Sequence, residues 1–83
     1  MEKKELINKA NEVLAEEFEV ELTDITPDAD IKETLDLDSL SLVDMVALIE
    51  TTFGVKIKSQ EIANVSTFSA LYDYLYDKLK KAA

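Results

Sequence analysis

Cysteine, histidine and arginine are absent from this 83-residue sequence, and glycine and proline occur once each. Without cysteine the chain forms no disulfides, and without cysteine or histidine it offers no thiolate or imidazole to a metal. The same absences exclude the common nucleophilic triads, and a single glycine excludes a Gly-rich phosphate loop. We therefore expect no catalytic residues and no metal site.

The scarcity of glycine and proline also argues against an all-β fold with many tight turns and favours helices. The length predicts a single domain over residues 1–83, and a hydrophobic fraction of 47% is enough for a core. No apolar run approaches the length of a membrane span. Because the first ten residues are charged and begin a helical pattern, they do not resemble a signal peptide, and we expect a cytoplasmic protein.

Negative charge is concentrated in one stretch. The net charge is −9, but residues 12–50 contain 13 acids and one base, Lys32, which gives −12 for that stretch. A nucleic-acid partner is therefore not expected, since such binders neutralise phosphates with Lys and Arg. Basic protein surfaces are the expected partners. A role in solubility alone would explain the sign of the charge and not its clustering.

Apolar residues recur at spacings of three and four in residues 2–18, 38–53 and from Phe68 onward, which predicts three main helices. Asp38 or Ser39 can cap the second helix, and Gly54 is its expected left-handed C-cap. Ser59 is the expected cap of a short helix over residues 59–63. Either Ser66 or Thr67 can cap the last helix.

Residues 19–37 form a long, irregular segment with turn residues around Pro27. A short helical turn is expected around residues 31–34. Five apolar residues are expected to attach this segment to the core: Val20, Leu22, Ile25, Ile31 and Leu35. The predicted fold is all-α, a small four-helix bundle of three main helices and one short helix, with a long first loop.

The helix over residues 38–53 carries two apolar stripes. The core stripe consists of Leu42, Met45, Val46, Ile49 and Phe53. The second stripe consists of Leu40, Val43 and Ala47, bordered by Asp44 and Glu50. It is either an exposed docking face or a surface packed under the long loop, and periodicity favours neither.

Ser39 lies at the start of that helix, where a serine is usually a cap. The same place also suits an attached phosphate, because free N–H groups and the helix dipole favour negative charge. On local sequence alone, the cap is the better interpretation.

The surrounding segments favour the second role. Asp38-Ser39-Leu40 resembles the Asp-Ser-Leu motif of acyl carrier proteins. Residues 26–29 resemble the loop that precedes the motif in that family, residues 53–57 the end of its helix, and residues 65–68 the start of its last helix. The resemblance covers essentially the whole chain, in order and with matching lengths.

The resemblance implies that a phosphopantetheinyl transferase, using coenzyme A and magnesium, attaches 4′-phosphopantetheine to Ser39. The thiol of this arm would then hold acyl groups as thioesters. The chain is accordingly expected to be a carrier, not an enzyme, and a monomer. Its expected partners are synthases, reductases and dehydratases with basic docking patches, most commonly those of fatty acid biosynthesis. The resemblance assigns six residues to the partner-facing side: Asp38, Leu40, Val43, Asp44, Ala47 and Glu50.

The sequence departs from the family pattern in two places. Asp36-Leu37 stand where a glycine is usual, and Ser41, Thr51 and Thr52 occupy positions that are often acidic in fatty-acid carriers. A carrier dedicated to a polyketide or other specialised acyl pathway is therefore an alternative. From a different class, an unmodified structural or interaction domain would use Ser39 only as a cap. Peptidyl carriers usually have a Gly-Gly pair before the serine, which this chain lacks.

The clustered charge leads to a prediction about stability. Salt or divalent cations should raise the melting temperature, because screening reduces repulsion among the acids of residues 12–50 in the folded state. Thermal melts at low and moderate ionic strength measure this. A flat or falling melting temperature would mean that the acids are already spaced or paired well enough not to repel.

Overall fold

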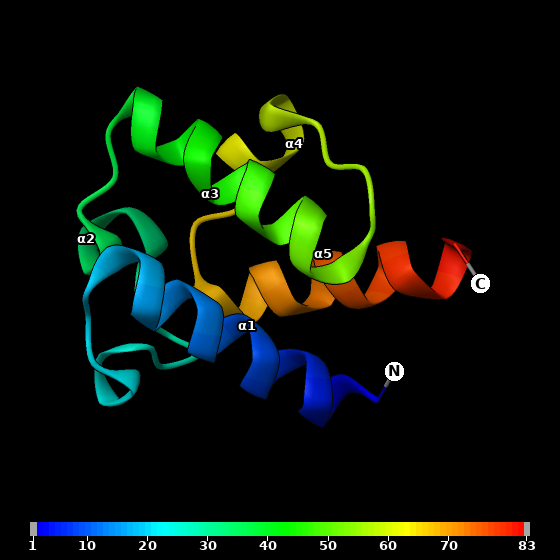
Figure 1. Cartoon of the computed structure of the whole chain (residues 1–83), viewed down its shortest axis with the longest axis horizontal. Coiled ribbons are helices and arrows are strands. Elements are labelled where there is room, and N and C mark those ends of the chain that lie inside the picture. The colour runs from blue at the N-terminus through cyan, green and yellow to red at the C-terminus, as the bar shows by residue number, and fades with distance from the viewer. Residues whose placement is uncertain (1, 83) are drawn as a thin grey trace.

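The computed structural model describes residues 2–82, and within this range the chain is helical (Figure 1). The elements, in order, are α1 (Lys3–Phe18), the 3-10 turn η1 (Leu22–Asp24), α2 (Ile31–Leu35), α3 (Ser39–Phe53), α4 (Ser59–Ala63) and α5 (Phe68–Ala82). The all-α prediction is confirmed, and the turn expected around residues 31–34 is a short helix of its own. Met1 and Ala83, the ends of the predicted domain, lie outside the described residues.

The three long helices pack around one core. α1 contacts both α5 and α3, and α4 contacts α3. Figure 1 shows both chain ends on the right, while α2 and the start of α3 lie at the opposite end. Each long helix contributes fully buried residues to the core, among them Leu6, Leu14, Met45, Ile49, Phe68, Leu71 and Leu75. No helix within residues 2–82 is both long enough and apolar enough to cross a membrane.

The long connection between α1 and α3 is anchored mostly as predicted, with one exception. Ile25, Ile31 and Leu35 are buried, and Val20 is half-buried against the core. Leu22 is 54% exposed, so the prediction that it attaches the segment to the core was wrong. The reason is the 3-10 turn that begins at Leu22. Ile25, the residue that follows this turn, enters the core in place of Leu22.

Backbone hydrogen bonds hold the second half of this connection on the start of α5. The N–H of Ile31 donates to the carbonyl of Ser66 over 2.9 Å. In return, the carbonyls of Ala29 and Pro27 accept from the N–H groups of Phe68 and Ser69, over 3.3 and 2.9 Å. These carbonyls satisfy N–H groups that have no partner within α5 itself. The position of α2 is thereby tied to α5.

A side-chain cluster joins α4 to α5. The hydroxyl of Tyr74 donates to the Glu61 carboxylate, and the Lys78 ammonium lies 3.4 Å from it. Burial, together with the adjacent Glu61 charge, raises the pKa of Tyr74 to about 12. The hydrogen bond from Tyr74 lowers the pKa of Glu61, with Lys78 adding to the effect.

The structure shows which of the predicted residues cap the helices. Gly54 ends α3 with a φ of 67°, the left-handed conformation that favours glycine. The Oγ1 of Thr67 accepts from the N–H of Ala70 over 3.2 Å, so Thr67 and not Ser66 caps α5. Ser59 does not cap α4, because the extended residue before that helix is Lys58 and Ser59 is already helical.

We predict that Thr67→Ala lowers the free energy of unfolding by about 0.5–2 kcal/mol, because it removes the cap of α5. Urea denaturation of both proteins measures the difference. Ser66→Ala is the matched control: Ser66 is exposed and contributes its backbone carbonyl, which the substitution keeps, so the change should stay within about 0.5 kcal/mol. An equal loss in both variants would contradict the assignment of the cap.

Candidate functional site

Asp38 starts α3. It is extended, with φ −104° and ψ −171°, and its Oδ1 accepts from the N–H of Ser41 over 2.8 Å. This hydrogen bond lowers the pKa of the Asp38 carboxyl below its ordinary value, so the cap is charged near neutral pH. Ser39 is the first helical residue and is exposed. Its hydroxyl is therefore not needed to cap the helix, although local sequence favoured that role.

A tight turn fixes the chain just before Ser39. Asp36 adopts the left-handed conformation, with φ 53° and ψ 52°, and its N–H donates to the carbonyl of Lys32. The N–H of Leu37 donates to the same carbonyl over 3.0 Å. Aspartate is one of the few residues besides glycine that tolerate this conformation. Asp36, which stands where the family usually has a glycine, thus occupies a position with a positive φ.

A hollow of about 280 Å³ opens beside the exposed serine. It is lined by Lys32 from α2, Leu37 and Asp38 from the connection, and Ser39 and Leu42 from α3. Leu37 and Leu42 are half-buried, while the two charged residues and Ser39 are exposed. Ser39 therefore lies in an open depression with apolar and charged walls.

The second stripe of α3 is exposed. Leu40 has 78% of its surface exposed and Val43 has 54%, and neither packs under the long loop. The buried residues of α3, which are Met45, Val46 and Ile49, all belong to the core stripe. The alternative in which the second stripe is covered is therefore wrong. We call the six predicted partner-facing residues the α3 face: Asp38, Leu40, Val43, Asp44, Ala47 and Glu50.

Glu50 differs from the rest of the α3 face. The other five residues are exposed, whereas Glu50 is half-buried. Its Oε2 accepts from the N–H of Ile57 over 2.9 Å. This hydrogen bond holds the connector over residues 55–58 against the end of α3. Sequence spacing places Glu50 beside the second stripe but gives no sign of this internal contact, which depends on how the chain folds back after Gly54.

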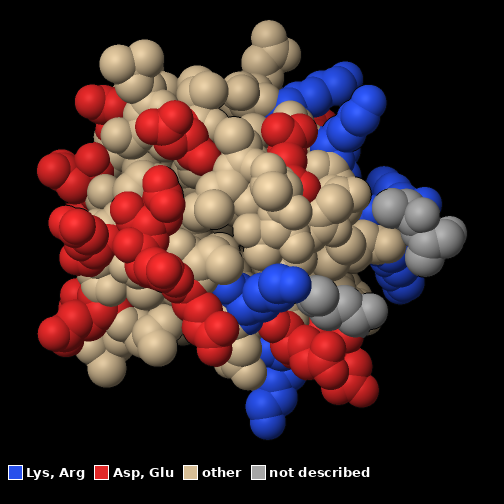
Figure 2. Space-filling model, viewed as in Figure 1, with Lys and Arg blue, Asp and Glu red and all other residues tan. Residues whose placement is uncertain are grey.

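The charges of the folded chain are unevenly distributed. Figure 2 shows most of the acidic side chains on the left, the end that contains α2, while lysines lie towards the right and the bottom, with a few acidic side chains among them. Within residues 2–82, the ion pairs join Lys3 to Asp73, Lys78 to Glu61 and Lys81 to Asp77, and none involves an acid from residues 12–50. Among the described residues, no group of three or more metal-ligating side chains is placed to hold an ion.

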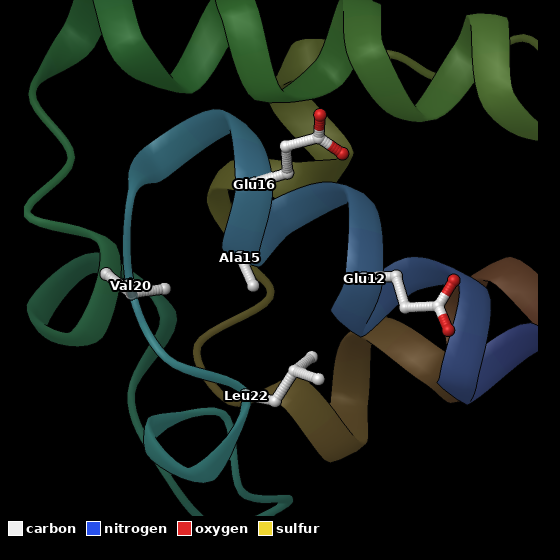
Figure 3. A pocket seen from close by; sticks show the side chains of 5 residues that line it. All are labelled: Glu12, Ala15, Glu16, Val20 and Leu22. Carbon is white, nitrogen blue, oxygen red and sulfur yellow. The ribbon is translucent and has the colours of Figure 1, made fainter.

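A second, larger hollow of about 470 Å³ lies at the end of α1 (Figure 3). Its walls are Ala15, Val20 and Leu22, with the carboxylates of Glu12 and Glu16 at its edge. None of these five side chains carries a hydroxyl or another group to which a phosphate could be esterified. The hollow beside Ser39 is therefore the candidate site.

Comparisons with known proteins indicate the family of the chain. Residues 9–75 match the family described as Phosphopantetheine attachment site. An acyl carrier protein of Petrotoga mobilis is 35% identical over 79 residues, covering 95% of this chain and 93% of the relative. An acyl carrier protein of Rubrobacter xylanophilus is 31% identical over 77 residues, covering 93% of this chain and 95% of the relative.

This family carries 4′-phosphopantetheine, bound covalently through a phosphate ester. The residues present fit such a group: the Ser39 hydroxyl is exposed at a helix start, and the hollow beside it is open. By its family match and by its coverage of relatives over nearly their full length, the chain belongs to the acyl carrier proteins.

Proposed function

We propose that this chain carries acyl intermediates on a 4′-phosphopantetheine arm attached to the Oγ of Ser39. In this proposal it presents them to the enzymes of fatty acid biosynthesis. One observation carries the choice of residue: Asp38, not Ser39, caps α3. The serine that the motif singles out thus has an exposed hydroxyl with no structural task at the helix start. A separate transferase can reach it without disturbing the fold.

The chain's own residues position the arm and do not react with its cargo. When bound, 4′-phosphopantetheine supplies a terminal thiol that holds acyl groups as thioesters. Asp38 fixes the first turn of α3, and the turn at Asp36 fixes the chain that leads to it. Ser39 is consequently held at a rigid helix end. This is where a carrier must present its arm if different enzymes are to find it in the same place.

The α3 face supports docking by partner enzymes with basic patches. Its exposed apolar residues, Leu40 and Val43, lie beside the exposed acid Asp44. Such a surface offers an apolar anchor surrounded by charges that attract Lys or Arg. The expected partners are the phosphopantetheinyl transferase and the synthases, reductases and dehydratases that act on the carried chain. The half-buried Glu50, already bonded to Ile57, is expected to contribute least to ion pairing.

We predict that Ser39→Ala removes modification and carrier function while the fold survives. Because Asp38 retains the cap, the free energy of unfolding should change by no more than about 0.5 kcal/mol. The measurement is the intact mass after incubation with a broad-specificity phosphopantetheinyl transferase and coenzyme A. The wild type should gain one 4′-phosphopantetheinyl group and Ser39→Ala none.

Ser41→Ala is the matched control, because Ser41 contributes its backbone N–H to the cap and should leave modification intact. If Ser39→Ala still gains the arm, the attachment site lies elsewhere. If the wild type gains nothing, the chain is the unmodified structural or interaction domain considered as the alternative.

We predict that the α3 face controls partner kinetics in two ways. Asp44→Lys should lower the association rate with an acyl-chain synthase by about 2- to 10-fold, more strongly at low salt, because exposed charges act mainly on encounter. Leu40→Ala and Val43→Ala should mainly raise the dissociation rate, weakening the complex about 5-fold if either side chain is a central anchor. Stopped-flow or surface binding with fully modified carriers measures both rates.

The chain offers matched controls outside the α3 face. Leu22→Ala removes a leucine that is exposed to the same extent as Val43, and Glu17→Lys reverses an exposed charge on α1. Both should behave nearly as the wild type. If the controls slow the synthase as much as the α3 variants do, only overall charge and hydrophobicity matter. Wild-type kinetics in all the α3 variants would place the docking face elsewhere.

A further inference from the structure

Lys32 is the one base among the 13 acids of residues 12–50. It lies on α2, the short helix that precedes the turn before Ser39. Lys32 is exposed, and within residues 2–82 it is not a member of any ion pair. A lone cation in the most acidic part of the chain, left without a carboxylate partner, is available to another anion.

The fold holds Lys32 next to Ser39. Its carbonyl accepts from the N–H groups of both Asp36 and Leu37, so the backbone of α2 is closed onto the segment that leads into α3. As a result Lys32 and Ser39, seven positions apart in sequence, line the same hollow. The carboxylate in that hollow, Asp38, is engaged with the N–H of Ser41. Lys32 is therefore the one cation among the five residues that line the site.

We propose that Lys32 pairs with the phosphodiester formed when the arm is attached to Ser39, and so fixes the root of the arm in this hollow. The inference rests on the proposed attachment at Ser39. The ester would add a negative charge to a region that already repels it, and a lysine ammonium binds phosphate as a point charge. Half-buried Leu37 and Leu42 line the same hollow and offer apolar contact to the part of the arm beyond the phosphate. Lys32 is a positioning residue in this account.

The primary experiment follows the Lys32 side chain directly. Intact mass first verifies that the wild type carries one arm on Ser39, with Ser39→Ala as the unmodified reference. NMR spectra of the lysine side chains, recorded at one pH, then compare the unmodified and modified proteins. The side-chain ammonium resonance of Lys32 should shift on modification, as expected when a new negative charge lies close to the ammonium.

Lys56 is the internal control for this measurement. It is an exposed lysine in the connector after α3, beyond the end of that helix opposite to Ser39. Its ammonium resonance should not shift on modification. Inorganic phosphate added to the unmodified protein, at the concentration of the modified protein, should not shift the ammonium resonance of Lys32 either. An equal shift with inorganic phosphate would mean general anion binding and would overturn the proposal.

The arm itself provides a second readout. In the modified protein, Lys32→Gln should shift the ³¹P resonance of the phosphodiester, Lys32→Arg should restore most of the wild-type position, and Lys56→Gln should leave it unchanged. If mass shows full modification but neither the Lys32 ammonium resonance nor the ³¹P resonance responds, the pairing is wrong and Ser39 remains the attachment site. If no arm is gained on Ser39, both the proposed function and this inference are overturned.

Discussion

Three backbone hydrogen bonds join the connection over residues 27–31 to the start of α5. These residues lie midway along the connection between α1 and α3, and without an anchor a connection of that length would leave the start of α3 unplaced. The bonds run in both directions: Ile31 donates to Ser66, while Ala29 and Pro27 accept from Phe68 and Ser69. Two of them pair N–H groups at the start of α5 that would otherwise lack partners. α2, the turn at Asp36 and the start of α3 all follow from this anchor.

From that anchor the site is built by short-range contacts. Asp30 caps α2 by accepting from the N–H of Glu33 over 3.0 Å, the left-handed Asp36 ends it, and Asp38 caps α3 two residues later. Aspartates thus cap both α2 and α3 and adopt the left-handed conformation between them. Serine caps and a glycine could have occupied the same positions. The start of α3 therefore does not depend on Ser39 as its cap, as the proposed attachment of the arm to its hydroxyl requires.

The bundle is too small to bury every apolar surface of its middle helix. α3 directs Met45, Val46 and Ile49 into the core and leaves Leu40 and Val43 exposed. Exposed apolar residues add little to the stability of the fold, and the proposed docking of partner enzymes would account for this stripe. Charge is also uneven over the molecule, since most acidic side chains gather at the end that contains α2, whereas the lysines lie mainly away from it (Figure 2). The proposed partners with basic surfaces would therefore be attracted to the end of the molecule that holds Ser39.

The sequence by itself determined the helices, most of their ends and the serine of the motif, because these depend on contacts within a few residues: apolar spacing, Gly54 after α3 and the Asp38-Ser39-Leu40 motif. Only the tertiary structure decided which surfaces stay exposed and which side chains meet. The sequence predicted that Leu22 would be attached to the core and left the exposure of Leu40 open, whereas both are exposed, because burial depends on which helices pack there from elsewhere in the chain. Likewise, the hydrogen bond that Glu50 accepts from the N–H of Ile57 and the position of Lys32 in the hollow beside Ser39 depend on how the connections fold back on α3.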